Sequence, residues 1–523
     1  MTSPAMAVDL PLHMLILLPL LAIPVLLLLR SRSSASRGNG GERLPPGPWA
    51  LPIIGHLHHL IGRGVLPHRR LRDLARRHGP LMLLRLGEVQ TVVASSAEAA
   101  REILKAHDLA FATRPMSPMS RLWFQGTGGG VVFAPYGDGW RQLRKICTVE
   151  LFSHSRVASF RPIRHAEVGR LLRAVAAEAG ANQQQTVNLT GRIASYVFAA
   201  TVRAIIGSRE FAERDAYMQM LKEMFRIVPG MSLPDLFPSS SLAMRVSRMP
   251  ALLARTRNNM HRLMDIIIKE HQEFRSPAGG EEEEDLVDVL LRLQKEAGFQ
   301  HPLTTQNIKF VMSDMFSAGS ETLSTALTWA MAELMRNPRV RHKLQEEIRR
   351  EFADDGMVME EKLGNLRYLR MVIKETLRLH PPGPLMVPRE CRTPCKVLGY
   401  DMPVGLTVLV NVWAISRDPV SWGDTAEEFL PERFEQCDTD FKGVDFEFIP
   451  FGAGRRICPG ISMALANMEL VLTALLFHFD FELPMEMSPK DMDMTEKSGL
   501  SMERKGKLFV VAVPRVPVPP AVE

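Results

Sequence analysis

The sequence predicts a mainly α-helical protein with small β-sheets and one large globular domain. Apolar residues recur at helical spacing through most of the chain, whereas alternating, β-like runs are short and few. The chain has 523 residues, of which 46% are hydrophobic and 23% are charged. These values are ordinary for a folded globular protein and exclude a collagen-like or largely disordered chain. A chain of this length can bury a large core and still enclose a bulky ligand.

The charge balance and the cysteine count exclude two further classes of protein. Lys and Arg exceed Asp and Glu by 64 − 58 = 6. This excess is small for the length, so we expect no nucleic-acid partner. Five cysteines are too few, and odd in number, for a disulfide framework. A reducing compartment therefore suits the chain.

The first thirty residues predict a membrane anchor. Residues 10–29 are almost wholly apolar, and at about 1.5 Å per residue such a helix reaches about 30 Å, the thickness of the hydrocarbon layer. Three arginines follow directly, while residues 1–9 contain no Lys or Arg. This asymmetry places the body of the protein in the cytosol. The alternative is a cleaved signal peptide, which needs a basic start that this sequence lacks.

Three segments follow from this pattern. Residues 1–30 are the predicted anchor, residues 31–48 a polar linker with a proline-rich hinge, and residues 49–523 the main domain. The helical patterns lie at 68–78, 96–106, 139–152, 162–180, 210–228, 250–275, 285–297, 305–337, 339–353 and 366–380. The β-like runs lie at 81–86, 90–94, 396–400, 406–410 and 507–513.

One cysteine stands in a pattern that points to chemistry. Cys458 lies between Gly454 and Gly460, follows Arg456, and precedes an apolar helix that begins at Ile461. Glycines let a backbone fold tightly beneath a flat ligand, and a helix N-terminus stabilises a thiolate. Arg456 suits a carboxylate close to the sulfur. An isolated cysteine would more often be a small buried hydrophobe.

On these residues, with Phe451 at the start of the loop, the sequence resembles the cytochrome P-450 superfamily of haem-thiolate monooxygenases. The resemblance implies that Cys458 is the axial ligand of a b-type haem, whose thiolate favours O–O cleavage. The stretches LPPGPWALPIIG, AGSET, KETLRLHPP, PERF and FGAGRRICPG are similar to the plant microsomal branch, which acts largely on specialised metabolites such as terpenoids and phenolics. That resemblance also implies the endoplasmic reticulum membrane and an NADPH-dependent cytochrome reductase as electron donor.

A second motif lies in the long helix predicted at 305–337. We expect Gly319 to kink this helix and to free backbone groups for water or a ligand. Glu321 and Thr322 follow, and an acid–alcohol pair can hold ordered water and relay protons. Taken alone, such a pair more often lies on an exposed helix surface and has no catalytic role. It matches the family's oxygen-activation motif. Asp314, one turn earlier, either joins the relay or caps a local network.

Two further sets of residues are assigned by the resemblance. Glu375 and Arg378 lie at i,i+3 on one helix, and Arg433 can complete a buried structural triad that supports the haem loop. Trp140 and Arg144 are implied to hydrogen-bond one haem propionate, with Arg456 on another. Arg389 is an open candidate for the same role. Two basic residues of the same helix, on the proximal side that the resemblance implies, are candidates for docking the reductase: Arg141 and Lys145.

Three functions fit the chain. The first is a monooxygenase that inserts one oxygen atom of O2 into an apolar small molecule. The second is a haem-thiolate isomerase or dehydratase, but such enzymes tend to lose the acid–alcohol pair that is present here. The third is a non-catalytic haem- or lipid-binding protein. Monooxygenase is the function we predict. By resemblance, four segments line the pocket: 118–131, 312–318, 385–387 and 498–500. Cys391 and Cys395 have zinc spacing but lack a second half-site.

Overall fold

The computed structural model describes residues 42–62, 64, 66–125, 129–180, 186–207, 232–273, 284–296, 300–435, 437–484, 487–497, 499 and 501–520. The predicted anchor at 1–30, most of the predicted linker and the predicted helix at 210–228 lie outside these residues. The same is true of Ser498 and Leu500, which belong to one predicted pocket segment.

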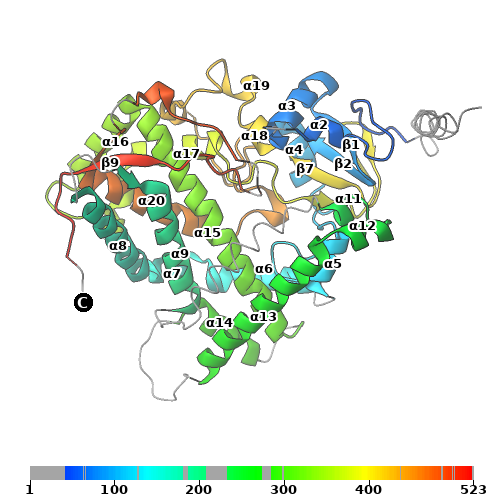
Figure 1. Cartoon of the computed structure of the whole chain (residues 1–523), viewed down its shortest axis with the longest axis horizontal. Coiled ribbons are helices and arrows are strands. Elements are labelled where there is room, and N and C mark those ends of the chain that lie inside the picture. The colour runs from blue at the N-terminus through cyan, green and yellow to red at the C-terminus, as the bar shows by residue number, and fades with distance from the viewer. Residues whose placement is uncertain are drawn as a thin grey trace, which may run out of the picture.

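Helices make up most of the described chain, as predicted (Figure 1). The α-helices are α2 (Leu57–Leu60), α3 (Pro67–His78), α4 (Ala97–Arg101), α5 (Pro118–Phe124), α6 (Asp138–Ile146), α7 (His154–Ser159), α8 (Arg161–Gly180), α9 (Leu189–Ile206), α11 (Leu233–Leu236), α12 (Ser241–Val246), α13 (Met249–Glu273), α14 (Leu286–Lys295), α15 (Thr305–Arg336), α16 (Pro338–Glu351), α17 (Arg367–Leu379), α18 (Val412–Ile415), α19 (Pro419–Trp422) and α20 (Ile461–His478). Single turns of other helix types are η2 (Glu102–Ala106), η3 (Cys147–Leu151), η4 (Glu360–Asn365), η5 (Pro431–Phe434), η6 (Gly454–Arg456) and η7 (Pro489–Asp491).

The strands form three small sheets. The largest has the order β1 (Leu81–Leu86), β2 (Val89–Ala94), β7 (Thr407–Val410) and β4 (Arg389–Glu390). The second has the order β3 (Thr186–Asn188), β9 (Phe509–Pro514) and β8 (Phe479–Glu482). The third is the hairpin of β5 (Cys395–Val397) and β6 (Tyr400–Met402). The largest sheet and the β9 sheet lie at opposite ends of the molecule, with helices between them (Figure 1).

Helix α15 crosses the centre of the molecule, and other helices pack around it (Figure 1). A Thr304 capping box starts the helix, and Asn337 ends it one residue before Pro338. Its C-terminal half is buried in the main core with α8, α9, α16, α17 and α20. Its N-terminal half is buried in a second core with α6, α13 and α14. The middle of α15 is therefore held in place from both sides.

Most of the predicted elements are confirmed, and the differences have physical causes. The run at 396–400 is wrong as a single strand, because Leu398 and Gly399 adopt positive φ values of 48° and 80° and turn the chain into the β5–β6 hairpin. Helix α9 was not predicted. It is apolar on nearly every side because it lies between α8 and α15, so it shows no amphipathic stripe.

Two helices of the described chain, α9 and α20, have the length and hydropathy of a membrane span. In each of them 61% of the apolar window is buried inside the protein. They are core helices of the fold, and they provide no evidence on the anchor predicted at residues 1–30.

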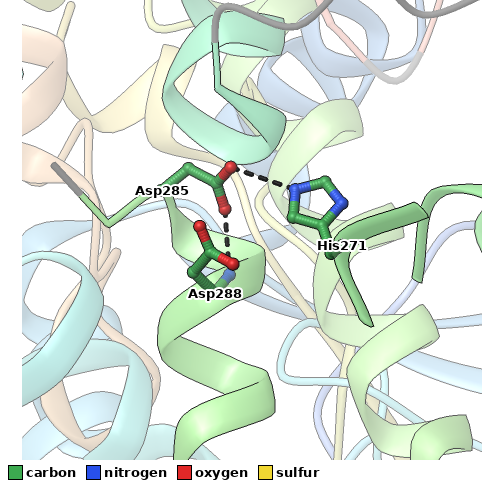
Figure 2. A group of neighbouring side chains, drawn as sticks. All are labelled: His271, Asp285 and Asp288. Atoms are coloured by element: carbon green, nitrogen blue, oxygen red, sulfur yellow. Dashed lines mark hydrogen bonds and ion pairs between the residues drawn. The ribbon is translucent and has the colours of Figure 1, made fainter. Parts of the chain in front are cut away.

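The junction of α13 and α14 is held by a buried histidine. His271 Nδ1 faces the carbonyl of Ile267 at 2.7 Å, and Nε2 faces the Asp285 carboxylate at 3.0 Å (Figure 2). Asp285 also caps α14 by accepting from the Asp288 N–H at 2.9 Å. Both ring nitrogens face oxygen acceptors, so the protonated imidazolium satisfies this geometry. Burial lowers the pKa of His271, but the hydrogen bond and charge of Asp285, the Ile267 carbonyl and the charge of Asp288 together outweigh burial and raise it.

Candidate active site

The loop that carries Cys458 is fixed by its own backbone. Cys458 follows the turn η6 and precedes α20, and its N–H donates to the Phe451 carbonyl at 2.9 Å. Gly454 has a φ of 67°, and a Cβ there would lie 2.3 Å from the carbonyl oxygen of Leu104. Only glycine fits this position, since both the backbone angle and the space exclude a side chain. Gly460 is the N-cap of α20.

The surroundings of the Cys458 thiol act on its charge in opposite directions. Burial raises the pKa of Cys458 above its ordinary value. The backbone N–H of Gly460 and the positive charge of Arg144 act to lower the pKa, in the direction that the sequence predicts. Burial is the larger effect in the protein alone. A metal ion on the sulfur would reverse this balance, because a coordinating thiol is deprotonated.

Arg456 lies buried beside the cysteine loop and is fully engaged with the chain from 112 to 134. It donates to the carbonyls of Ala112 at 2.7 Å, Ala134 at 2.7 Å and Val131 at 3.2 Å. Its guanidinium lies 3.8 Å from the ring centre of Trp140. The indole N–H of Trp140 donates to Val131 as well, at 2.9 Å. The structure thus brings Trp140 and Arg456, which the resemblance assigned to two different propionates, into direct contact.

Arg144 and Arg389 complete the basic surroundings of the loop. Arg144 donates to the carbonyl of Ile457, the residue before the cysteine. Arg389, from β4, donates to the Ala453 carbonyl at 2.9 Å and to the carboxylate of Asp108 at 3.3 Å. Both arginines therefore reach the cysteine loop, from α6 on one side and from the largest sheet on the other.

A further buried arginine, Arg114, was missed by the sequence analysis. It donates to the carbonyls of Val387 at 2.7 Å, Pro388 at 2.8 Å and Val132 at 3.0 Å. Its position before Pro115 gave one clue in the sequence. The residue before a proline favours an extended backbone, so Arg114 was not expected on the exposed face of a helix. Its burial depends on segments that lie more than 250 residues further along the chain, which no local pattern reveals.

These arginines concentrate positive charge in a buried space. Burial, followed by the charges of Arg389 and Arg144, lowers the pKa of Arg456 to about 9. Burial and the charges of Arg456 and Arg389 lower the pKa of Arg114 well below its ordinary value. The hydrogen bonds given above for Arg114 and Arg456 go to uncharged backbone carbonyls. A ligand with two carboxylates beside the cysteine would balance this charge, so the site fits the propionates and iron of haem.

The middle of α15 is exposed on one face. Ala318 and Thr322 are exposed and lie one turn apart on the same face, although the turns on either side of them are largely buried. The Thr322 hydroxyl donates to the Ala318 carbonyl at 2.5 Å. The helix is continuous through Gly319. A Cβ there would make an ordinary van der Waals contact, 3.4 Å from the side chain of Thr201 on α9.

Glu321 lies next to Thr322 but faces the segment near the C-terminus. Burial and the nearby charge of Glu503 raise the pKa of Glu321 to about 7, against a hydrogen bond with Ser501 that lowers it. A carboxyl group with this pKa exchanges its proton readily near neutral pH. The acid and the alcohol of the predicted pair are therefore adjacent in the chain but engage different surroundings.

Asp314 caps a backbone network, which is one of the two roles that the sequence left open. One oxygen of its carboxylate accepts from the N–H groups of Val131 at 2.6 Å and Val132 at 3.0 Å. A Cβ on Gly130 would lie 2.2 Å from this oxygen, so the loop approaches the carboxylate without a side chain. Burial raises the pKa of Asp314 to about 6, while the two N–H groups oppose that shift.

The structure brings Glu375, Arg378 and Arg433 together. Arg378 forms a two-pronged ion pair with Glu375 at 2.7 and 2.9 Å, and Arg433 reaches the same carboxylate at 2.9 Å. All three side chains are buried. The remaining N–H groups of Arg378 donate to the carbonyls of Ser416 and Ala426, each at 2.7 Å. The charges are thus paired and hydrogen-bonded, as buried charges must be.

Fold and site together define a haem-thiolate oxygenase, and comparison with known proteins agrees. A family model described as cytochrome P450 matches residues 45–510. The chain belongs to the cytochrome P450 family. It is an oxygen-inserting monooxygenase whose cofactor is a thiolate-ligated haem.

The relatives are plant enzymes. The chain is 45% identical to premnaspirodiene oxygenase from Hyoscyamus muticus and to 5-epiaristolochene 1,3-dihydroxylase from Nicotiana tabacum, in each case over 91% of this chain and 94% of the relative. A solved structure, a zebra fish cytochrome P450 with abiraterone, superposes with a TM-score of 0.71 and 26% identity, over 86% of this chain and 99% of that one.

Proposed function

We propose that this monooxygenase hydroxylates an apolar plant metabolite of the terpenoid class, with electrons supplied by an NADPH-dependent cytochrome reductase. The supporting observation is the similarity to two enzymes that are named for oxygenation of terpenoids, and that cover almost the whole chain. Glu321 and Thr322 are both present, which favours oxygen insertion over the isomerase reaction considered above.

The proposed haem site uses residues of three regions. Cys458 would hold the iron, in the loop shaped by Phe451, Gly454 and Gly460. The propionates would be held by a set from α6 and the loops around it: Arg114, Trp140, Arg144 and Arg456. The haem supplies oxygen activation once it is bound, and its thiolate ligand favours O–O cleavage. The buried guanidinium groups of Arg114 and Arg456 would surround this group with positive charge.

The side chains around the proposed substrate space are apolar. Phe124 and Val131 from the predicted pocket segment at 118–131 belong to the same buried cluster as Met312 and Met315 of α15. Such walls bury an apolar substrate and exclude water, while discriminating weakly between similar hydrocarbons. Thr322 on the exposed face of α15 would position a water or hydroxyl group, and Glu321 would exchange its proton with the outside.

The reductase would dock at the outer face of α6. A hollow of about 460 Å³ lies there, bordered by Arg141, Gln142, Lys145 and His301. Arg141 and Lys145 are both exposed, and Arg141 forms an ion pair with Asp138. The cysteine loop lies behind this helix, because Arg144 of the same helix contacts Ile457. An acidic partner surface would meet Lys145 at a short distance from the proposed haem.

We further propose that the protein is anchored to the endoplasmic reticulum membrane by residues 1–30, with the domain of residues 49–523 in the cytosol. Near the start of the described chain, Trp49, Ile53 and Ile61 expose 65%, 64% and 70% of their surface. Helix α12 exposes Leu242 and Val246. The two regions are joined at one turn, since the N–H of Gly87 donates to Ile54 and the N–H of Glu88 donates to Leu236. Such an apolar face suits the membrane surface.

The first experiment is the difference spectrum of the reduced, carbon-monoxide-bound protein, recorded for the wild type and for Cys458→Ala. We expect a Soret band far to the red of ordinary haem proteins, and its loss in the variant. The protein is then combined with reductase, NADPH and apolar terpenoids in the presence of isotopically labelled O2. One labelled oxygen atom in the product supports the proposal. A product formed without O2 or reductase would establish an isomerase or dehydratase instead.

The membrane proposal is tested by fractionation of cells that express the full chain or a chain lacking residues 1–41. We expect the full chain in the microsomal fraction and a larger soluble share of the shortened chain. Adding Ile53→Asp and Ile61→Asp should release the shortened chain fully. A matched control is Val420→Asp, because Val420 is 93% exposed on α19, far along the chain from both regions. Equal release by the control would contradict the proposed apolar face.

A further inference from the structure

Two cysteines outside the active site lie on either side of one tight turn. Cys391 follows strand β4, and Cys395 is the first residue of β5. Cys391 is buried and Cys395 is half-buried. The turn between them, Arg392-Thr393-Pro394, connects the largest sheet to the β5–β6 hairpin. Their spacing suits half of a zinc site, but the sequence lacks a second half-site, and the two cysteines have no part in the proposed reaction.

The Cys391 thiol faces the strand that pairs with Cys395. It donates to the carbonyl of Thr393 at 3.1 Å and to that of Met402 at 3.4 Å. Met402 is the residue directly opposite Cys395 in the hairpin, where opposing Cα atoms are about 4.5–5.5 Å apart. Each of the two thiols also shifts the pKa of the other. The turn therefore brings the two cysteines to neighbouring positions, from which a disulfide can close.

The backbone holds this pair together. The N–H of Cys391 donates to the Leu406 carbonyl at 2.9 Å, and the Cys391 carbonyl accepts from Gly405 at 2.8 Å. Cys395 is held by the ladder of the hairpin. Both ends of the turn are therefore anchored in sheet structure, and proline at position 394 restricts the chain between them. The two thiols meet because of the fold and not through a chance approach of mobile side chains.

We propose that Cys391 and Cys395 form a reversible disulfide when a hydroperoxide oxidises the protein. In the first step the more exposed Cys395 thiol reacts with hydrogen peroxide to give a sulfenic acid and one molecule of water. In the second step the Cys391 sulfur attacks the sulfenic sulfur, and a second molecule of water leaves. Two thiols lose two electrons and two protons in total, and the peroxide is reduced to two molecules of water. Two equivalents of a cytosolic thiol reverse the reaction.

The reaction depends on pH. Burial raises the pKa of Cys391, and burial and the neighbouring sulfur raise the pKa of Cys395 to about 12. Only the thiolate reacts, so at neutral pH disulfide formation is slow and its rate rises about tenfold for each unit of pH. The pair is therefore a site that responds to sustained oxidation and not a fast sensor. Cys391 lies two residues after Arg389, and Arg389 donates a hydrogen bond to the carbonyl of Ala453 in the cysteine loop. The disulfide would therefore form close to this loop.

The test uses the full haem-loaded chain exposed to hydrogen peroxide at about pH 7 and about pH 9, with iodoacetamide added under denaturing conditions to block the remaining thiols. Trypsin cuts after Arg389, Arg392 and Lys396, so the turn is opened between the two cysteines. We expect one species in which the peptides 390–392 and 393–396 are joined, with the mass of two hydrogen atoms missing. This species should disappear on reduction and form faster at the higher pH.

The controls are single serine variants. Cys391→Ser and Cys395→Ser should each abolish the joined species. Cys437 is the matched control, because it is half-buried like Cys395. Cys437→Ser should leave the joined species unchanged, because the Cys437 thiol donates elsewhere, to the Arg433 carbonyl. If the wild-type peptides both carry iodoacetamide after a treatment that oxidises Cys437, the proposal is wrong. It is also wrong if Cys395 accumulates as sulfinic acid without the joined species. Neither result depends on whether the variants fold or turn over substrate.

Discussion

The carboxylate of Asp314 and the N–H of Val131 are 2.6 Å apart, although the two residues are separated by 183 positions in the chain. The carbonyl of the same Val131 accepts from Arg456 and from Trp140. One peptide segment therefore has an anion on its N–H side and a cation on its carbonyl side. This arrangement connects the centre of α15 to the cysteine loop.

Asp314→Ala should weaken this connection. Hydrogen bonds to a charged group contribute about 1.5–3 kcal/mol each, so losing the two bonds should cost about 3–6 kcal/mol of stability and lower the haem content. Asp314→Asn keeps one acceptor oxygen and should lose less. The measurements are the unfolding free energy and the haem absorbance per polypeptide. Ser317→Ala is the control, because the Ser317 hydroxyl donates only to the backbone carbonyl of Asp314 in the contacts described. Wild-type haem content in Asp314→Ala would contradict the role of Asp314 as an anchor of the loop.

The buried triad gives a second prediction. Arg378→Ala leaves the carboxylate of Glu375 inside the core with only Arg433 to balance it, and removing one partner of a buried ion pair costs about 3–5 kcal/mol. We expect little folded, haem-loaded protein at growth temperature. Arg339→Ala, which removes an exposed pair with Glu432, should cost less than about 1 kcal/mol. Denaturant unfolding measures the loss of unfolding free energy in both variants. Similar losses would show that burial of the ion pair does not determine how much the substitution destabilises the protein.

The pKa of Glu321 gives a third prediction, on catalysis. Because burial and Glu503 raise this pKa to about 7, the protonated donor form is lost as the pH rises through 7. The rate of product formation with saturating reductase should therefore fall above about pH 7. Glu321→Gln should be slower by about 100-fold and should lose this pH dependence. Asp493→Asn, which changes a carboxylate near the protein surface, is the control. An unchanged pH profile in Glu321→Gln would exclude Glu321 from proton transfer.

The histidine at the α13–α14 junction gives a prediction on stability and pH. The pKa of His271 is raised in the folded protein, because the hydrogen bond and charge of Asp285 outweigh burial, with a further contribution from Asp288. A raised pKa means that the folded state binds the proton more tightly than the unfolded state. Its contribution is complete below the ordinary value of 6.5 and is lost as the pH rises through the higher folded value.

We therefore expect the unfolding free energy to decrease as the pH rises above 6.5 and through the raised pKa of His271, with a smaller decrease in His271→Gln. Denaturant unfolding at several pH values measures both. The variant His78→Gln, at the exposed end of α3, corrects for the general effect of removing a histidine. Parallel curves for the wild type and His271→Gln would mean that His271 is neutral in the folded protein.

Much of the fold and part of the site could be predicted because their determinants are local. The periodicity of apolar residues marks α3 and α17, whose polar faces differ clearly from their buried faces. The cysteine loop is contiguous, and its glycines reflect backbone angles and close approaches within that loop, as at Gly454. The pairing of Glu375 with Arg378 follows from helix geometry alone. Helix α9 could not be found this way, because burial on most sides removes the amphipathic pattern.

The sequence by itself determined the helical class of the fold, the cysteine loop and the acid–alcohol pair on α15, since each depends on residues within about ten positions of one another. Only the tertiary structure decided which charges share a buried space. Arg114 becomes part of the basic cluster, and Asp314 becomes the anchor of the loop at 130–132. Burial and long-range charge set these roles, and both depend on segments that lie far apart along the chain.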